Sequence, residues 1–307
     1  MSKEQRAAVD ALLRAAPFDG SRTPEELRAA FVALMADNPA PTGVTLTEDS
    51  LGGRPALRIE PQDGVTGGTI LYFHGGSGVF GSPATAQHIT GALVRRTGAR
   101  AVSLDYRLAP EHPFPAAIED ALAAYRELLE QGVPAGQIVL AGDSAGGGLS
   151  VVTTLAARDA GLPLPAAVVA FSPGLDATRS GESMTTKHGI DPLFTRRSLE
   201  QVGAHYLAGQ DPRQPLLSPA VLADLTGFPP LLLQAGTNEL LLDDSTRLAT
   251  RAAAAGVDVI LDVTADVPHV FQSFTGSLDE ADAALDRAGR FILDRLATVA
   301  AQAPTGF

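Results

Sequence analysis

A serine set between two glycines is the group in this sequence best suited to covalent chemistry. Gly142-x-Ser144-x-Gly146 stands between a buried-looking strand candidate, residues 138–141, and a helical pattern. Small neighbours allow such a turn to hold the serine in a strained backbone conformation with its hydroxyl exposed. The pattern predicts that Ser144 is a nucleophile and that the backbone N–H of Ala145 donates to a developing oxyanion. The alternative is a glycine-rich turn with an ordinary serine.

A second glycine-rich loop follows the strand candidate at residues 69–73. It reads His74-Gly75-Gly76-Ser77-Gly78. Successive glycines let backbone N–H groups face a carbonyl oxygen, so we expect those of Gly75 and Gly76 to complete an oxyanion hole. His74 is expected to hold this loop by hydrogen bonds rather than to act as a base. A tight turn without a chemical role is the alternative.

A serine nucleophile needs a base, and three histidines follow Ser144 in the chain: His188, His205 and His269. His269 comes after the strand candidate at residues 257–263 and before the C-terminal helical pattern, where a catalytic histidine can reach the nucleophile. His188 and His205 fall in a stretch without a clear strand. The sequence therefore predicts His269 as the base.

These motifs together resemble those of the bacterial hormone-sensitive lipase family. His74-Gly75-Gly76 is similar to the family's HGGG loop, and residues 142–147 match its GDSAGG turn. Residues 105–117, DYRLAPEHPFPAA, are similar to a specific signature between the two motifs, and residues 211–219 and 269–272 also resemble the family. The resemblance covers roughly residues 45–300. It implies a capped α/β-hydrolase that cleaves short or medium acyl esters, or lactones, without a cofactor or metal.

The sequence departs from the family pattern in the glycine loop. Ser77 replaces the third glycine, and Gly78 stands where an aromatic residue is usual. Losing that ring removes bulk beside the acyl site. We therefore expect Ser77 and Gly78 to line a roomier or differently shaped substrate pocket.

The catalytic acid is the second departure. The resemblance places the family's aspartate at Asn238, and a neutral amide cannot stabilise the imidazolium of the transition state. We expect Asn238 to occupy the acid's place in a weakened enzyme. The alternatives are that Glu239 or Asp266 replaces the acid through a rearranged loop. A non-catalytic small-molecule-binding protein on the same fold, or a lactone or amide hydrolase, also stays open.

Apolar strand candidates alternate with helical patterns along most of the chain, at residues 69–73, 101–104, 138–141, 166–171, 231–234 and 257–263. This alternation predicts an α/β protein with a mostly parallel twisted sheet and helices on both faces. We expect residues 46–307 to form the hydrolase domain. Residues 1–45, with a second segment at about 175–225, are expected to form a helical cap over the strand ends, where ligands bind in such sheets.

Composition excludes several classes of function. The net charge of −12 argues against a nucleic-acid partner, because phosphate binding needs clustered Lys and Arg. The absence of cysteine excludes disulfides and thiolate metal sites, and no apolar run is long enough to predict a membrane helix. We expect a cytoplasmic protein with a small-molecule substrate and a possible homodimer.

Overall fold

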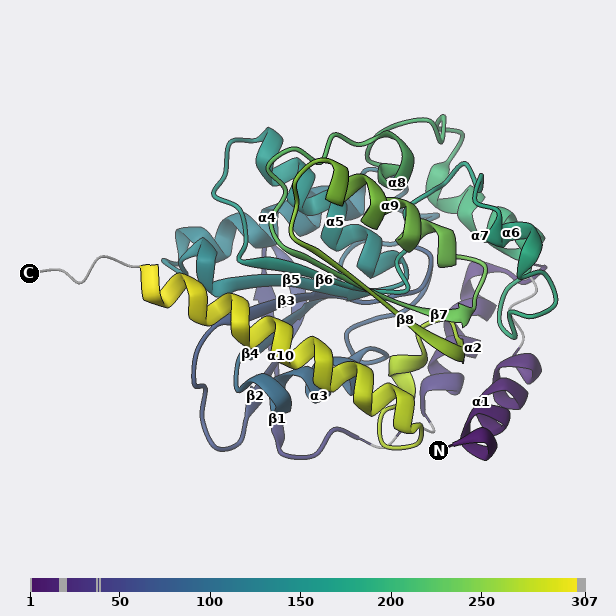
Figure 1. Ribbon diagram of the computed structural model, residues 1–307, viewed down its shortest axis with the longest axis horizontal. Helices are drawn as coiled ribbons and strands as arrows, with labels where there is room; N and C mark the ends of the chain where they lie inside the picture. The colour runs from purple at the N-terminus through teal and green to yellow at the C-terminus, as the bar shows by residue number, and fades with distance from the viewer. Residues whose placement is uncertain (1, 17–20, 37, 39, 303–307) are drawn as a thin grey trace, which may run out of the picture.

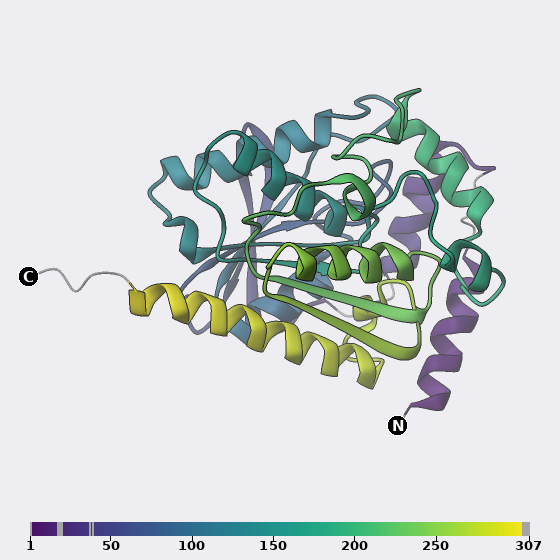
Figure 2. The same cartoon turned by 45° about the horizontal axis from the view of Figure 1, so that its top comes forward.

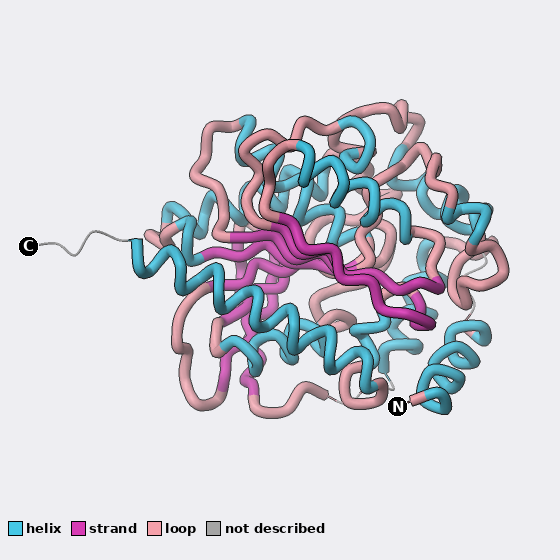
Figure 3. Tube along the Cα trace, viewed as in Figure 1, coloured by secondary structure: helices cyan, strands magenta, loops and turns pink. Residues whose placement is uncertain are grey.

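An eight-stranded β-sheet runs through the protein (Figure 3). The structure is a computed structural model, and it describes residues 2–16, 21–36, 38 and 40–302. The strands are β1 (Val44–Leu51), β2 (Arg54–Pro61), β3 (Thr69–Phe73), β4 (Arg100–Leu104), β5 (Ile138–Asp143), β6 (Ala167–Phe171), β7 (Leu231–Asn238) and β8 (Val259–Pro268). They lie in the order β1-β2-β4-β3-β5-β6-β7-β8, and every pair from β4 to β8 is parallel. The predicted α/β class with a mostly parallel sheet is confirmed.

The antiparallel hairpin at one edge of the sheet is a part that the strand candidates did not include. β1 pairs with β2 from Leu51↔Arg54 outward, and β2 runs antiparallel to β4. Gly52 and Gly53 form the two-residue turn with φ of 62° and 72°, which two successive glycines adopt without strain. Most of β1 is exposed, so its sequence lacks the apolar run that marked the other strands.

Helices cover both faces of the sheet (Figures 1 and 2). One face carries α3 (Gln87–Thr97) and α10 (Asp279–Gln302), and the other carries α4 (Ala116–Glu130), α5 (Ala145–Asp159) and α9 (Leu242–Ala254). Successive side chains of a strand point to opposite faces. In β3, accordingly, Leu71 and Phe73 join the core under α4 and α5, whereas Ile70 and Tyr72 join the core under α3 and α10.

Four further helices in the described part of the chain lie at the side of the molecule where β7 and β8 end (Figure 1). They are α1 (Lys3–Ala15) and α2 (Pro24–Ala36) at the N-terminus, and α6 (Ser183–Thr186) and α7 (Arg196–Leu207) between β6 and β7. The short helix α8 (Pro219–Leu222), also between β6 and β7, lies beside α9 instead. Leu27 and Phe31 of α2 pack in one apolar cluster with Val202 and Tyr206 of α7. The two segments predicted to form a cap are therefore in contact. Their boundaries stay a prediction, and residues 1, 17–20, 37 and 39 of the first segment, with 303–307 of the predicted hydrolase domain, lie outside the described residues.

The helix α1 packs on the segment that follows β8. Val9 and Leu13 share an apolar cluster with Phe271 and Phe274 of the short 3-10 helix Phe271–Phe274. The N-terminal segment is thus fixed close to the predicted base, His269. Among the described helices, none combines the length and the apolar character that crossing a bilayer requires.

Candidate active site

Ser144 occupies a sharp turn between β5, which ends at Asp143, and α5, which begins at Ala145. Its φ of 53° and ψ of −119° are unusual for a residue with a side chain. A Cβ at Gly146 would stand 2.0 Å from the carbonyl oxygen of Phe73, and one at Gly142 would stand 2.3 Å from that of Gly146. Only glycine fits at these two positions, so the spacing that predicted a nucleophile is a steric requirement of the turn.

The predicted base lies within hydrogen-bond distance of this serine. His269 Nε2 is 2.9 Å from Ser144 Oγ, and the histidine side chain is 3% exposed. β8 continues to Pro268, five residues beyond the predicted strand, and so delivers His269 directly from the carboxyl edge of the sheet. His188 and His205 lie elsewhere, beside α6 and on α7.

The acidic side chain that contacts His269 is Glu239, and Asn238 does not take this place. Glu239 Oε2 lies 2.7 Å from His269 Nδ1, and its side chain is completely buried. Its other oxygen, Oε1, accepts a hydrogen bond of 3.0 Å from the N–H of Gly236. The Glu239 carboxylate favours the tautomer of His269 that carries its proton on Nδ1. In that tautomer the lone pair of Nε2 can accept a hydrogen bond from the Ser144 hydroxyl.

The expectation that Asn238 occupies the acid's place is wrong for this structure. Asn238 is the last residue of β7, beyond a register irregularity between Gly236 and Asn238, and it pairs with Pro268. It is partly exposed, and its Oδ1 accepts from Thr237 Oγ1 at 3.3 Å. Two positions along β7, from Gly236 to Asn238, oppose four along β8, from Thr264 to Pro268, so β8 bulges at this point. Glu239 follows directly after the end of β7 and is the residue that contacts His269. Asp266 is also excluded, since its side chain is 72% exposed and pairs with Arg6 at 3.0 Å.

The loop that carries Glu239 is tied to the segment between β6 and β7. Asp191 accepts hydrogen bonds from the N–H groups of Leu240, at 2.8 Å, and of Phe194, at 2.9 Å. The ring of Phe194 meets the His269 ring edge-on, with the centroids 5.1 Å apart. Asp191 and Phe194 thus brace the acid and the base. Sequence reasoning missed both, because nothing in their local pattern indicates a contact so distant along the chain.

The glycine loop after β3 is held by buried aromatic side chains. The His74 ring stacks on Tyr106 with the centroids 4.2 Å apart, and the Tyr106 hydroxyl donates to the His74 carbonyl at 2.6 Å. His74 Nδ1 lies 2.8 Å from the carbonyl oxygen of Gly75. Burial lowers the pKa of His74 to about 4, so the ring is neutral at pH 7. These contacts match the loop-holding role expected for His74.

The N–H groups predicted to form the oxyanion hole do not all belong to residues that line the cavities beside Ser144. Gly75 lies against the buried Asp143 carboxylate, whose pKa its N–H lowers, and it lines neither cavity. Gly76, Ser77 and Ala145 do line those cavities, and no backbone acceptor for their N–H groups is found among the described residues. Gly76, Ser77 and Ala145 are thus the candidates for an oxyanion hole, and the position of Gly75 does not support its predicted role.

Asp143 itself is a buried carboxylate next to the nucleophile. The Tyr72 hydroxyl donates to its Oδ1 at 2.8 Å. Burial raises the pKa of Asp143 to about 6, against the opposing effect of the Tyr72 hydrogen bond. Its contacts with Tyr72 and Gly75 join β3 and the glycine loop to the turn of Ser144.

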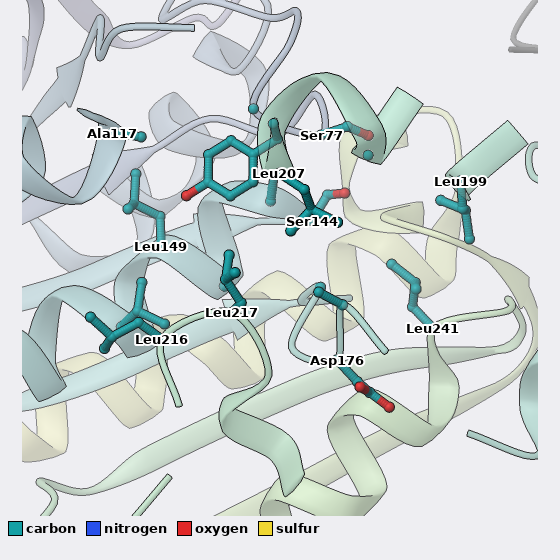
Figure 4. Close-up of a pocket in the computed structure, with 18 of the residues that line it drawn as sticks. Ser77, Ala117, Ser144, Leu149, Asp176, Leu199, Leu207, Leu216, Leu217 and Leu241 are labelled. Carbon is teal, nitrogen blue, oxygen red and sulfur yellow. The ribbon is translucent and has the colours of Figure 1, made fainter. Parts of the chain in front are cut away.

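Two cavities meet at Ser144. The larger is about 340 Å³, and the smaller, about 50 Å³, is lined by His269, Phe194 and Phe80. His269 lines only the smaller of the two. The walls of the larger cavity are mostly apolar and include six leucines, which Figure 4 shows around Ser144: Leu149, Leu199, Leu207, Leu216, Leu217 and Leu241. The described residues contain no group of His, Asp and Glu side chains that could hold a metal ion.

Comparison with known proteins decides the family. A family model described as alpha/beta hydrolase fold matches residues 70–273. This chain belongs to the α/β-hydrolase family. It is 48% identical over 226 residues to the acetyl-hydrolase of Streptomyces hygroscopicus, covering 74% of this chain and 75% of that protein. It is 32% identical over 287 residues to an esterase of Acinetobacter venetianus, covering 92% and 94% of the two chains.

Comparison with solved structures indicates which group of α/β-hydrolases the chain resembles. The crystal structure of an esterase from the bacterial hormone-sensitive lipase family superposes with a TM-score of 0.92 at 40% identity, covering 96% of this chain and 99% of that one. The esterase EstE5 superposes with a TM-score of 0.91 at 37% identity, covering 95% and 99%. The resemblance to the bacterial hormone-sensitive lipase family is confirmed.

Gly78 shows how this α/β-hydrolase fills the space left by the missing aromatic residue. A Cβ at Gly78 would stand 2.7 Å from Cδ2 of Tyr206, a residue of α7, and the φ of Gly78 is 69°. The ring of Tyr206 therefore occupies the space beside the glycine loop. A side chain from the segment between β6 and β7 thus takes the place of the aromatic ring that is missing at position 78. This contact could not be inferred from the sequence, because the two residues lie far apart in the chain.

Proposed function

We propose that this chain is a carboxylic ester hydrolase that works through an acyl-enzyme at Ser144. The observation that carries the proposal is the continuous hydrogen-bond chain from Ser144 Oγ through His269 to Glu239, at 2.9 and 2.7 Å. A nucleophile, a base and a group that orients the base are all in reach of one another. The names of relatives, acetyl-hydrolase and esterase, support ester cleavage as the reaction.

In the proposed mechanism Ser144 attacks the ester carbonyl while His269 Nε2 takes its proton. The Glu239 carboxylate stabilises the imidazolium that forms. The N–H groups of Gly76, Ser77 and Ala145 receive the negative charge of the tetrahedral intermediate. His269 then protonates the leaving alkoxide, and water releases the acyl group by the same steps in reverse. A lactone follows the same course with the alcohol still attached.

Each of the two cavities is expected to hold one part of the ester, the alcohol part or the acyl part. The leaving oxygen must lie beside His269, which protonates it, and only the smaller cavity contains His269. The alcohol part therefore lies on that side and the acyl part in the larger, mostly apolar cavity of about 340 Å³. That volume suits a short or medium acyl chain. The buried carboxylate of Glu239 beside His269 supports a competent esterase over a weakened enzyme or a non-catalytic binder.

The test is pre-steady-state hydrolysis of 4-nitrophenyl butanoate. We expect a burst of 4-nitrophenol approaching one equivalent per active site, followed by slower turnover, because acylation precedes hydrolysis of the acyl-enzyme. Mass spectrometry of the quenched burst should find the butanoyl group on Ser144, and Ser144→Ala should abolish both. A burst that survives in Ser144→Ala would show that another nucleophile reacts and contradict the proposal.

A further inference from the structure

Arg179 introduces a cation into the otherwise mostly apolar larger cavity. It lies in the turn after β6, where its φ of 53° is unusual for a residue with a side chain, and its N–H donates to the Asp176 carbonyl at 3.1 Å. Nη2 of Arg179 lies 3.8 Å from the point where a Cβ at Gly203 would stand. The turn and the glycine of α7 thus leave room for the guanidinium group at the cavity wall.

The guanidinium group of Arg179 has no ion pair and no hydrogen-bond acceptor within the described part of the chain. Arginine has five N–H donors and stays charged at any ordinary pH. Arg179 is partly exposed and none of its nitrogens is a fully buried atom without a partner, so the group is available to an anion that enters the cavity. Its three acidic neighbours therefore have to be considered one at a time.

Asp176 lines the same cavity, but its carboxylate is fully used elsewhere. Oδ2 accepts from Arg247 Nη1 at 3.1 Å and from Ser180 Oγ at 2.7 Å, and Oδ1 accepts from the Thr178 N–H at 2.9 Å and from its hydroxyl. The side chain is 0% exposed, and Figure 4 shows its oxygens directed away from Ser144. The charge of Asp176 is thus balanced by Arg247 and not by Arg179.

Glu200 and Asp244 are no better partners for Arg179. Glu200, an exposed residue of α7 at the cavity rim, pairs with Arg196 at 2.8 Å. Asp244 is buried behind the turn, where its Oδ2 accepts from the N–H groups of Leu175 and Asp176 at 2.7 and 2.9 Å. The charge of Arg179 lowers the pKa of Asp244, yet the two groups make no direct contact. The cation in the cavity is left without a partner of its own.

We propose that Arg179 binds an anionic group at the far end of the acyl chain, so that the preferred substrates are half-esters of dicarboxylic acids. This inference rests on the proposed function, which places the acyl chain in this cavity. A carboxylate matches the planar fork of a guanidinium group and would form the two hydrogen bonds that the protein leaves unmade. The leucine walls between Ser144 and Arg179 would hold the methylene groups of the chain.

The experiment compares two series of esters of equal length on the intact protein. Monomethyl succinate, glutarate, adipate, pimelate and suberate carry the distal carboxylate, and the methyl esters of the straight-chain monocarboxylic acids lack it. Methanol release gives kcat/KM for each. We expect the anionic series to have a sharp length optimum in the wild type. At that length, Arg179→Gln should lower the ratio of anionic to neutral kcat/KM by about 10- to 100-fold, as for loss of charged hydrogen bonds.

Two matched variants separate binding from general electrostatics. Arg197→Gln removes the same charge from an exposed position on α7, outside the larger cavity, and should change the ratio by less than about threefold. Arg179→Lys keeps a charge without the fork and should retain part of the preference. Glu200→Gln removes the negative charge at the rim and should increase the preference for anionic esters.

Several results would overturn the inference. An equal loss on both series in Arg179→Gln means that Arg179 only supports the turn or the charge of Asp244. A wild type that prefers neutral esters at every length, measured without any variant, contradicts it directly. In both cases turnover of the neutral esters leaves the proposed esterase function standing. Failure to hydrolyse either series, with no burst from 4-nitrophenyl butanoate, would instead remove the proposed function and this inference with it.

Discussion

The two sides of Ser144 are built in different ways. On the catalytic side, each residue stands at or close to a strand end: Gly76 lies in the loop just after β3, Glu239 immediately after β7 and His269 immediately after β8. On the pocket side, Arg179, Tyr206 and Leu217 come from the long connection between β6 and β7. The parallel sheet brings strand ends to one edge and so fixes the reacting groups. The connection is free to vary, and it shapes what those groups can reach.

The largest effect should come from the acid on the catalytic side. Glu239→Gln keeps the shape of the side chain but removes the charge that stabilises the His269 imidazolium, and we expect kcat to fall by roughly 10³- to 10⁴-fold. Asn238→Asp, one residue earlier and at a side chain that bonds Thr237 and not His269, should change kcat by less than about threefold. Steady-state rates with 4-nitrophenyl butanoate measure both. A gain of tenfold or more in Asn238→Asp would return the acid to position 238.

An intermediate effect should appear on the pocket side, in the pH dependence of the free energy of unfolding. Burial raises the pKa of Asp244 to about 7, above the ordinary value of 3.8 for an aspartate. Between about pH 4 and pH 7 the folded protein therefore binds a proton that the unfolded chain has released, so the free energy of unfolding falls as the pH rises through this range. Asp244→Asn should remove this fall, a difference of roughly 2–4 kcal/mol between the two ends of the range.

Urea unfolding of the wild type and the variant at pH 5 and pH 8 measures that difference. Asp211→Asn, at an exposed position, is the control and should leave the pH dependence unchanged. If Asp244→Asn loses as much stability between pH 5 and pH 8 as the wild type does, the ionisation of Asp244 is not what weakens the pocket side at high pH.

The smallest effect should be on selectivity. Tyr206→Ala removes the ring that fills the space beside Gly78, so the larger cavity should accept longer acyl chains. We expect the acyl chain of the preferred 4-nitrophenyl ester to be longer by a few carbons in the variant. The value of kcat/KM for 4-nitrophenyl acetate should change by only a few-fold. His205→Ala, its neighbour on α7, lines neither cavity and is the control. An unchanged chain-length profile in Tyr206→Ala would show that Tyr206 does not bound the acyl site.

The sequence predicted the parts of the site that depend on local sterics or on strand order. The glycines at 142 and 146 are needed because a Cβ at either position would clash with backbone atoms near the turn itself. His269 was predicted because a parallel sheet places the end of β8 at the same edge as the turn of Ser144. Fold class, nucleophile and base could therefore be predicted without any knowledge of long-range packing.

The acid, the third oxyanion donor and the pocket were decided only by the tertiary structure. Glu239, just after the end of β7, contacts His269 in place of Asn238 at a point where the pairing of β7 with β8 is irregular, and no residue pattern in β7 announces this contact. Ser77 replaces Gly75 among the proposed donors because Gly75 is engaged by Asp143 and lines neither cavity beside Ser144. Tyr206 and Arg179 reach the cavity because a long connection folds back over the strand ends. The glycine spacing follows from backbone contacts that such a strand-to-helix turn makes with itself and with the neighbouring parallel strand, whereas the partner of a side chain depends on how distant segments pack together.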